Sequence, residues 1–202
     1  MRPSSCVESI HEQHLPSEIV LDRMATSEAP ELIGLAQRTL RDLRLRVAGA
    51  SGGGPDALRE AGYAGAGSLF DAFEMWLGDR GSAKAEDLPI DEFSGSAAEF
   101  FQNAGWGSVA FRSLHDALAV IDIEGCWEAQ LHGEDERGCH LTTGTLAGFL
   151  GCLADYPVAV MEIECSVGGR CRFLAGNADM LEHAYDRVSR GESWESIGAG
   201  EF

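Results

Sequence analysis

The chain has 202 residues, with 15 lysines and arginines against 33 aspartates and glutamates, which gives a net charge of −18. This acidic balance argues against a dedicated nucleic-acid-binding protein, because neutralising phosphates requires basic patches. No apolar run reaches the length that a bilayer requires, and the first residues lack the apolar core of a secretory signal. We therefore expect a cytoplasmic protein with one domain of ordinary size.

The N-terminal half of the sequence is predicted to be mainly helical. Residues 1–28 are polar and aperiodic, which indicates a disordered leader. From residue 30 to 47, apolar side chains recur at helical spacing, so a first helix is predicted there. A second helix is predicted over 55–81, and its many small residues permit the close approach of another backbone or of a ligand. A third helical stretch covers 91–107.

The C-terminal half mixes strands with helices. Apolar and alternating segments predict strands over 108–114, 117–125, 158–167 and 171–176, and helices over 139–157 and 178–191. A Gly-Gly turn separates the last two strands, which is typical of a hairpin. Without regular βαβ alternation, this order favours an α+β fold with an antiparallel sheet flanked by helices. The domain is predicted to span 29–190, with a polar tail over 191–202.

Four residues of the C-terminal third form a candidate metal site: Cys139, Glu162, Cys165 and Cys171. Cys165 and Cys171 flank the Gly-Gly turn, which brings two thiols close enough to share a cation. Glu162 and Cys165 lie three residues apart on one strand, so they reach one site only if the strand bends or bulges. Cys139 begins the helix that returns antiparallel to this strand, and a helix N-terminus favours the thiolate.

The cysteines have an alternative interpretation, and the sequence lacks the common catalytic motifs. The alternative for the four site residues is that the thiols are small buried hydrophobes, and we interpret Cys126 as structural or incidental. The sequence contains no G-x-S-x-G motif, no Walker loop and no H-E-x-x-H motif. It also lacks a dinucleotide fingerprint, so a nicotinamide-dependent reductase has no visible cofactor site.

The run from Cys139 to Phe173 resembles the 4-vinyl reductase domain family in its TGxLAG helix, Pro-Val strand, Glu-x-x-Cys step, glycine turn and Cys-x-Phe end. The segments AGYAGAGSLFDAF and AAEFFQNAGWGSVAF are also similar, so the likeness covers about residues 55–175. The family is related in fold to the TRAPP vesicle-tethering subunits and to sensor domains of aromatic-responsive transcription activators. The resemblance implies an α+β fold around an enclosed apolar pocket, often in a homodimer.

The resemblance also implies a zinc ion near the pocket, held in the sensor branch of the family by three cysteines and a glutamate. Carried over by position, these ligands are Cys139, Glu162, Cys165 and Cys171. The chain departs from the family in its last turn, because only five residues separate the final two cysteines. Four protein ligands leave no open position for water, so we expect a structural ion without Lewis-acid chemistry.

Large apolar residues from the predicted helices and strands are candidates for lining the pocket. They are Phe100, Phe101, Trp106, Phe111, Ile123, Trp127 and Phe149. A mainly apolar cavity with few polar groups is the usual site for a small molecule. The two tryptophans each carry an indole N–H that needs a partner when buried, and either could donate to a ligand. The alternative for each of the seven residues is an ordinary place in the core.

These expectations favour a stand-alone module that senses or carries a small hydrophobic molecule, whether aromatic, tetrapyrrole-like or lipid. The chain shows no helix-turn-helix and no ATPase module, so any output passes through a regulatory partner or a homodimer, with helix 31–47 as the candidate dimer element. One alternative is an enzyme or accessory protein of (bacterio)chlorophyll or tetrapyrrole metabolism. Another is an interaction subunit whose pocket is permanently filled by a lipid.

Overall fold

The structure is a computed structural model that describes residues 32–49, 54–115, 118–129, 138–166 and 168–197. The predicted leader at 1–28 lies outside the described residues, as does nearly all of the acidic loop that follows residue 132. All statements below concern the described ranges.

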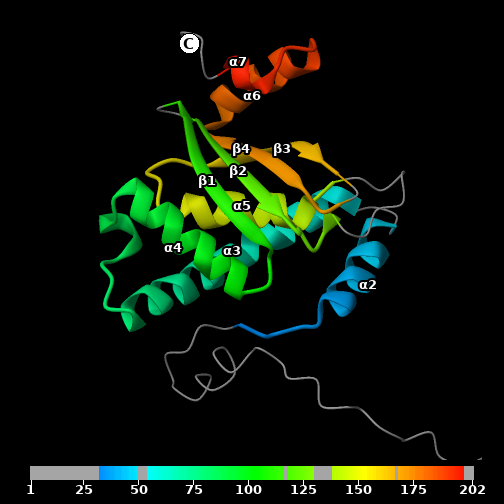
Figure 1. Ribbon diagram of the computed structural model, residues 1–202. Coiled ribbons are helices and arrows are strands. Elements are labelled where there is room, and N and C mark those ends of the chain that lie inside the picture. The colour runs from blue at the N-terminus through cyan, green and yellow to red at the C-terminus, as the bar shows by residue number, and fades with distance from the viewer. Residues whose placement is uncertain (1–31, 50–53, 116–117, 130–137, 167, 198–202) are drawn as a thin grey trace, which may run out of the picture. The chain divides into compact units, whose positions relative to one another are not determined.

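These ranges form six α-helices, one 3₁₀ turn and a four-stranded sheet (Figure 1). In chain order they are α2 (Gln37–Ala48), α3 (Gly54–Asp79), η1 (Ala85–Asp87), α4 (Ile90–Asn103), β1 (Ser108–His115), β2 (Leu118–Glu124), α5 (His140–Gly151), β3 (Ala159–Cys165), β4 (Cys171–Gly176), α6 (Ala178–Ser189) and α7 (Trp194–Ile197). The sheet is antiparallel throughout, in the order β1-β2-β4-β3. The predicted α+β class, with helices flanking an antiparallel sheet, is confirmed. Within the described ranges, no helix combines the length and apolar content that crossing a bilayer demands.

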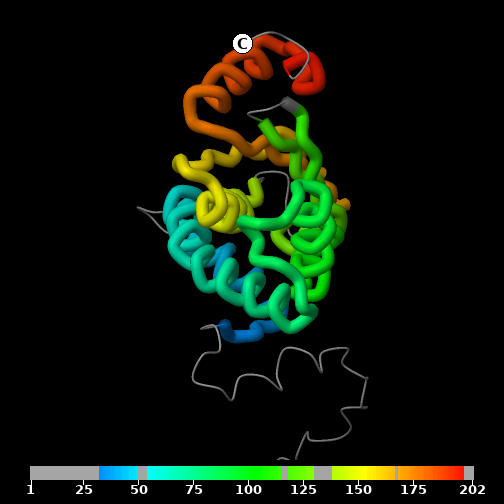
Figure 2. Tube along the Cα trace, turned by 90° about the vertical axis from the view of Figure 1, so that its left-hand side faces the viewer, coloured from blue at the N-terminus to red at the C-terminus, as the bar shows by residue number. Residues whose placement is uncertain are grey.

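Helices cover both faces of the sheet. α3, α4 and α5 lie on one face, and α6 and α7 lie on the other (Figures 1 and 2). The two central strands are therefore buried on both sides: Ile121 and Phe173 pack in the larger core under α3 to α5, while Val120 and Leu174 pack under α6. This double burial explains why β2 and β4 are almost continuously apolar rather than alternating.

Two ends of the predicted elements differ from the sequence-based prediction. α2 begins at Gln37 rather than near residue 30, because Ala36 is extended and its carbonyl accepts the first bonds of the helix. Leu32, upstream of this point, packs against the larger core instead of continuing a helix. The segment after α6 also folds back as the short helix α7, which the prediction did not include, and it buries Ile197 completely.

The small residues of the second predicted helix let α5 approach α3 closely. A Cβ at Gly62 of α3 would lie 2.2 Å from the Leu141 carbonyl oxygen, and a Cβ at Gly144 of α5 would lie 2.0 Å from the Arg59 carbonyl oxygen. Larger side chains would push the helices apart, so these glycines set their distance. The close packing fixes the start of α5, and with it the position of Cys139.

Candidate metal centre

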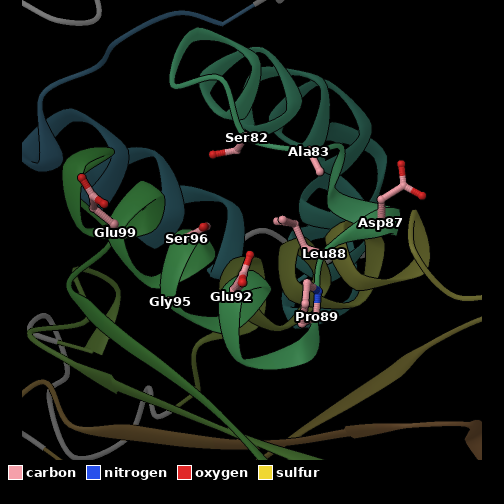
Figure 3. Close-up of a pocket in the computed structure, with 9 residues that line it drawn as sticks. All are labelled: Ser82, Ala83, Asp87, Leu88, Pro89, Glu92, Gly95, Ser96 and Glu99. Carbon is pink, nitrogen blue, oxygen red and sulfur yellow. The ribbon is translucent and has the colours of Figure 1, made fainter.

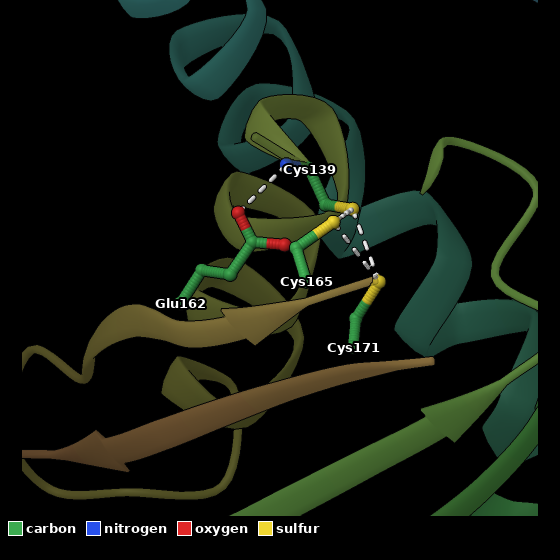
Figure 4. A group of neighbouring side chains, drawn as sticks. All are labelled: Cys139, Glu162, Cys165 and Cys171. Carbon is green, nitrogen blue, oxygen red and sulfur yellow. Dashed lines mark hydrogen bonds between the residues drawn. The ribbon is translucent and has the colours of Figure 1, made fainter. Parts of the chain in front are cut away.

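Three thiols meet where the β3–β4 hairpin reaches the start of α5 (Figure 4). Cys165 and Cys171 are cross-strand partners with their Sγ atoms 3.7 Å apart. The Sγ of Cys139, the residue just before α5, lies 3.9 Å from that of Cys165 and 3.4 Å from that of Cys171. In a tetrahedral zinc site with Zn–S bonds of about 2.3 Å, two sulfur ligands are separated by about 3.8 Å. The three thiols thus lie close to the spacing of one face of a zinc tetrahedron.

A β-bulge brings Glu162 to the same face. Glu162 pairs with Phe173 and Glu164 pairs with Arg172, so Ile163 is an extra residue in β3. The extra residue turns Glu162 and Cys165 toward the same side of the sheet. This is the bulge that the three-residue spacing requires if both side chains are to share a site. All four donor atoms, from Cys139, Glu162, Cys165 and Cys171, lie within 4.8 Å of one another.

The carboxylate of Glu162 supplies the test of whether these residues suit a cation. Its Oε2 accepts a hydrogen bond of 2.9 Å from the backbone N–H of Cys139. Its Oε1 is buried and has no hydrogen-bond partner in the described part of the chain. Leaving a buried carboxylate oxygen unpaired is costly, whereas a cation placed among the three thiols would satisfy it. The donor set of three sulfurs and one oxygen fits zinc.

The electrostatics of the group point the same way. Burial raises the pKa of Glu162 to about 7, although the backbone N–H of Cys139 opposes the shift. The neighbouring thiols, that of Cys126 most of all, raise the pKa of Cys139. Without a positive charge among them, Glu162 and the thiols therefore resist losing their protons together. A bound cation would favour their ionised forms, so its binding would release protons.

A further cysteine, Cys126, joins the group. Its Sγ lies 3.8 Å from that of Cys139, and it is fully buried. Its backbone N–H donates a bond of 2.9 Å to the carbonyl of Gly169 in the hairpin turn. The sequence analysis interpreted Cys126 as structural or incidental, and did not place it beside the candidate donors. Sequence spacing offers no signal for it, because it arrives through the pairing of β2 with β4, which places Ile123 opposite Cys171.

A buried ion pair holds the start of α5. Glu128 is fully buried and accepts bonds from the backbone N–H of Thr142 at 2.9 Å and from its hydroxyl at 2.8 Å. Arg44 of α2 donates to the Glu128 carboxylate at 3.0 Å and to the Gly138 carbonyl at 2.7 Å. A carboxylate at a helix N-terminus satisfies free N–H groups and complements the helix dipole. This pair fixes the chain on both sides of Cys139.

The seven predicted pocket residues lie in one cluster between the sheet and the helices beneath it. Phe101 is at its centre, with ring centroids 5.0 Å from Phe149, 5.9 Å from Trp106 and 6.3 Å from Phe111. Five of the seven are buried, and Trp106 and Phe111 are partly buried. We call the full set the aromatic cluster: Phe100, Phe101, Trp106, Phe111, Ile123, Trp127 and Phe149. In this structure six of them pack in or against the larger core, and Trp127 joins them through its ring contact with Trp106.

A surface pocket of about 380 Å³ lies between α4 and the segment 82–89 that precedes it (Figure 3). Its lining mixes small or apolar residues such as Ala83, Leu88 and Pro89 with the acidic residues Asp87, Glu92 and Glu99. It shares no residue with the aromatic cluster, which α4 contacts through its inward face at Phe100 and Phe101. This pocket is therefore distinct from the apolar one that the sequence predicts.

Comparison with known proteins gives a structural likeness only. No protein-family model and no curated protein matches the sequence. Among solved structures, the chain is similar to the phenol-responsive sensory domain of the transcription activator PoxR with phenol, at a TM-score of 0.59 and 17% identity over 78% of this chain and 82% of that one. A vinyl-4-reductase family protein from Methanocaldococcus jannaschii aligns at a TM-score of 0.48 and 17% identity over 72% of this chain and 83% of that one. The likeness to the sensory domain shows a shared fold and agrees with the resemblance found in the sequence.

Proposed function

We propose that this chain is a ligand-binding module in which a structural zinc ion fixes one end of an aromatic interior that accepts a small hydrophobic molecule. The observation that carries the proposal is the convergence of three thiols and a carboxylate oxygen of Glu162 within 4.8 Å, together with the buried, unpartnered Oε1 of that carboxylate. The shared fold supports it, because the PoxR domain is described as phenol-responsive and with phenol. The module acts as a sensor or a carrier.

Zinc would be held by Cys139, Glu162, Cys165 and Cys171. When bound, it supplies positive charge to a donor group that is otherwise costly to ionise, and it cross-links elements that are distant in sequence. The elements joined are the start of α5 and the tip of the β3–β4 hairpin. A centre of this kind stabilises the fold around the aromatic cluster and performs no chemistry on the ligand.

The ligand would enter the aromatic cluster. Trp127 follows Cys126 directly in the turn beside the metal centre, and its ring lies 6.3 Å from that of Trp106. Aromatic rings at such separations favour edge-to-face packing, which a small aromatic ligand can join by displacing one ring. The indole N–H of either tryptophan would then donate to a ligand oxygen. Phenol is the natural first probe, since it combines one ring with one hydroxyl.

Calorimetric titration of the zinc-loaded chain with phenol tests this function. We expect saturable binding, and we expect Trp106→Phe or Trp127→Phe to weaken it about three- to tenfold through loss of one hydrogen bond. The matched control is Tyr185→Phe, which loses a hydroxyl at an exposed position on α6. Absence of binding by phenol up to millimolar concentration, in protein shown to be folded and zinc-loaded, would remove phenol-like ligands from the proposal.

The proposal includes a homodimer formed through α2. Leu43 and Val47 are exposed on this helix, and Ile33 and Leu35 are exposed just before it. Leu43 and Val47 lie one turn apart on α2, and exposed apolar side chains that share a face are typical of an interaction surface. Sedimentation of the full chain at micromolar concentration is expected to give a dimer that Leu43→Glu dissociates. A wild-type monomer under those conditions contradicts this part of the proposal.

A further inference from the structure

The metal centre has one donor more than a tetrahedral ion needs. Beside the four residues assigned to zinc, the Cys126 thiol contacts that of Cys139 at 3.8 Å. Cys139 in turn lies 3.9 Å from Cys165 and 3.4 Å from Cys171, and the last two are 3.7 Å apart. Four of the six edges of a four-sulfur tetrahedron are therefore near the spacing that a metal imposes. Cys126 lies outside the group of donor atoms that are all within 4.8 Å of one another, so its side chain must move toward Cys165 and Cys171 to bind the same ion.

The position of Cys126 is built rather than incidental. Its N–H is bonded to Gly169, in the turn between two of the zinc ligands. The Cys126 side chain is fully buried, and Glu128, two residues further along the same turn, is held by its ion pair with Arg44.

We propose that Cys126 is a fifth donor of this centre, which replaces Glu162 when the bound cation is thiophilic. The inference rests on the proposed metal centre. Thiolates select soft cations, whereas a carboxylate prefers harder ones. Zinc, which is intermediate, takes three sulfurs and the Glu162 oxygen, and a softer ion such as Cd²⁺ takes four sulfurs. The centre thus accepts two classes of metal with one set of side chains.

The exchange is balanced in atoms and charge. The bond between the metal and Glu162 Oε1 breaks, and a bond between the metal and Cys126 Sγ forms. The proton that leaves the Cys126 thiol is taken up by the released carboxylate. The total charge of the site stays the same, and no group is oxidised or reduced. The carboxylate keeps its other oxygen within hydrogen-bond distance of the Cys139 N–H, at 2.9 Å.

The test compares cadmium and zinc in the full, metal-free chain kept under a reductant. Thiolate-to-metal charge-transfer absorbance per bound Cd²⁺ counts the sulfur ligands. We expect Cys126→Ser to lower this absorbance by about one quarter and to lower the preference for Cd²⁺ over Zn²⁺ at least about tenfold. Glu162→Gln is expected to leave the cadmium spectrum unchanged and to weaken zinc binding. The control is Cys152→Ser, at an exposed thiol near the end of α5.

A second measurement needs no substitution, in case the buried Cys126 variant fails to fold. The ¹¹³Cd resonance of the wild-type chain reports the number of sulfur donors directly, and four are expected. A wild-type spectrum with three sulfur donors, or a Cys126→Ser variant that keeps the wild-type absorbance and preference, overturns the role of Cys126 while the zinc centre stands. A wild-type chain that binds neither ion overturns the metal centre itself.

Discussion

Acidic side chains on the two faces of β3 and β4 have different kinds of partner. On the outer face, Arg172 bonds to Asp122 and to Glu164, the latter at 3.2 Å. The indole of Trp194 also donates to Glu164 at 3.1 Å, and the Arg172 guanidinium lies 4.5 Å from the centre of that ring. One residue further along the same strands, the inner face carries Cys165 and Cys171.

The difference shows what each face needs. The outer carboxylates are matched by arginines of the chain itself, so that network is complete without any other molecule. The inner group consists of three thiols and the carboxylate of Glu162. One oxygen of this carboxylate accepts a bond from a backbone amide, and the other is buried without a partner in the described residues. Groups that become anionic together in a buried place need a cation. This difference is the basis for the proposed metal ion on the inner face.

The largest effect is expected from removing the thiol of Cys139, which contacts the other three thiols. Cys139→Ser is expected to abolish stable zinc binding, because Cys139 contacts Cys126, Cys165 and Cys171. Competition with a chromophoric chelator should show an affinity at least about 100-fold below wild type, beyond the loss usual for residues that only support a ligand. Retention of wild-type affinity would mean that the ion binds elsewhere.

The buried side chain of Arg44 lies near the metal centre. Its substitution tests how much the ion pair with Glu128 contributes to the free energy of unfolding. Arg44→Met leaves Glu128 charged, fully buried and without its guanidinium, so we expect a loss of about 3 kcal/mol in the free energy of unfolding. Urea unfolding at neutral pH measures it. The control, Arg46→Met at an exposed position on the same helix, should change stability by less than about 0.5 kcal/mol. Equal losses of unfolding free energy in the two variants would show that the ion pair does not stabilise the fold.

Glu162→Gln sharpens the comparison through pH. The raised pKa of about 7 means that a proton competes with zinc for this carboxylate, so wild-type affinity should rise as pH increases through 7. The variant is expected to bind about tenfold more weakly and to lose that part of the pH dependence, as measured by calorimetry between pH 6 and 8. In the metal-free chain, the raised pKa of Glu162 contributes stability that is fully present below pH 4.5, the ordinary pKa of this group, and that is lost as pH rises through about 7. A parallel pH profile in the variant would place the titration elsewhere.

The smallest effect is expected on the outer face. Burial opposes ionisation of Asp122, but bonds from Arg172 and Arg112 outweigh it and hold its pKa below the usual value. Its contribution is therefore present above pH 3.8 and is lost as pH falls below that value. Because these groups are partly exposed, Asp122→Asn should cost about 1 kcal/mol or less at neutral pH and leave the zinc content unchanged. A loss of zinc in this variant would show that the two faces are coupled.

The sequence predicts the candidate donors better than their surroundings. The spacing of Cys139, Glu162, Cys165 and Cys171, the need for a bulge in β3 and the family resemblance together indicated that these four side chains meet at one end of the fold, where the structure brings them together. Cys126 could not be found this way, because its approach depends on the register of β2 against β4. The helix at 194–197 was missed because a single buried side chain, Ile197, decides it. The mutual packing of the aromatic cluster depends on helix-to-sheet distances, which the spacing of residues does not contain.

The central claim is that the inner group holds a metal ion, and metal content tests it most directly. Plasma mass spectrometry of tag-free protein, purified without chelator, should find about one zinc per chain in the wild type and in Cys152→Ser. The same measurement should find almost none in Cys165→Ser. Wild-type protein without metal, or a Cys165→Ser variant that keeps its zinc, would contradict the account.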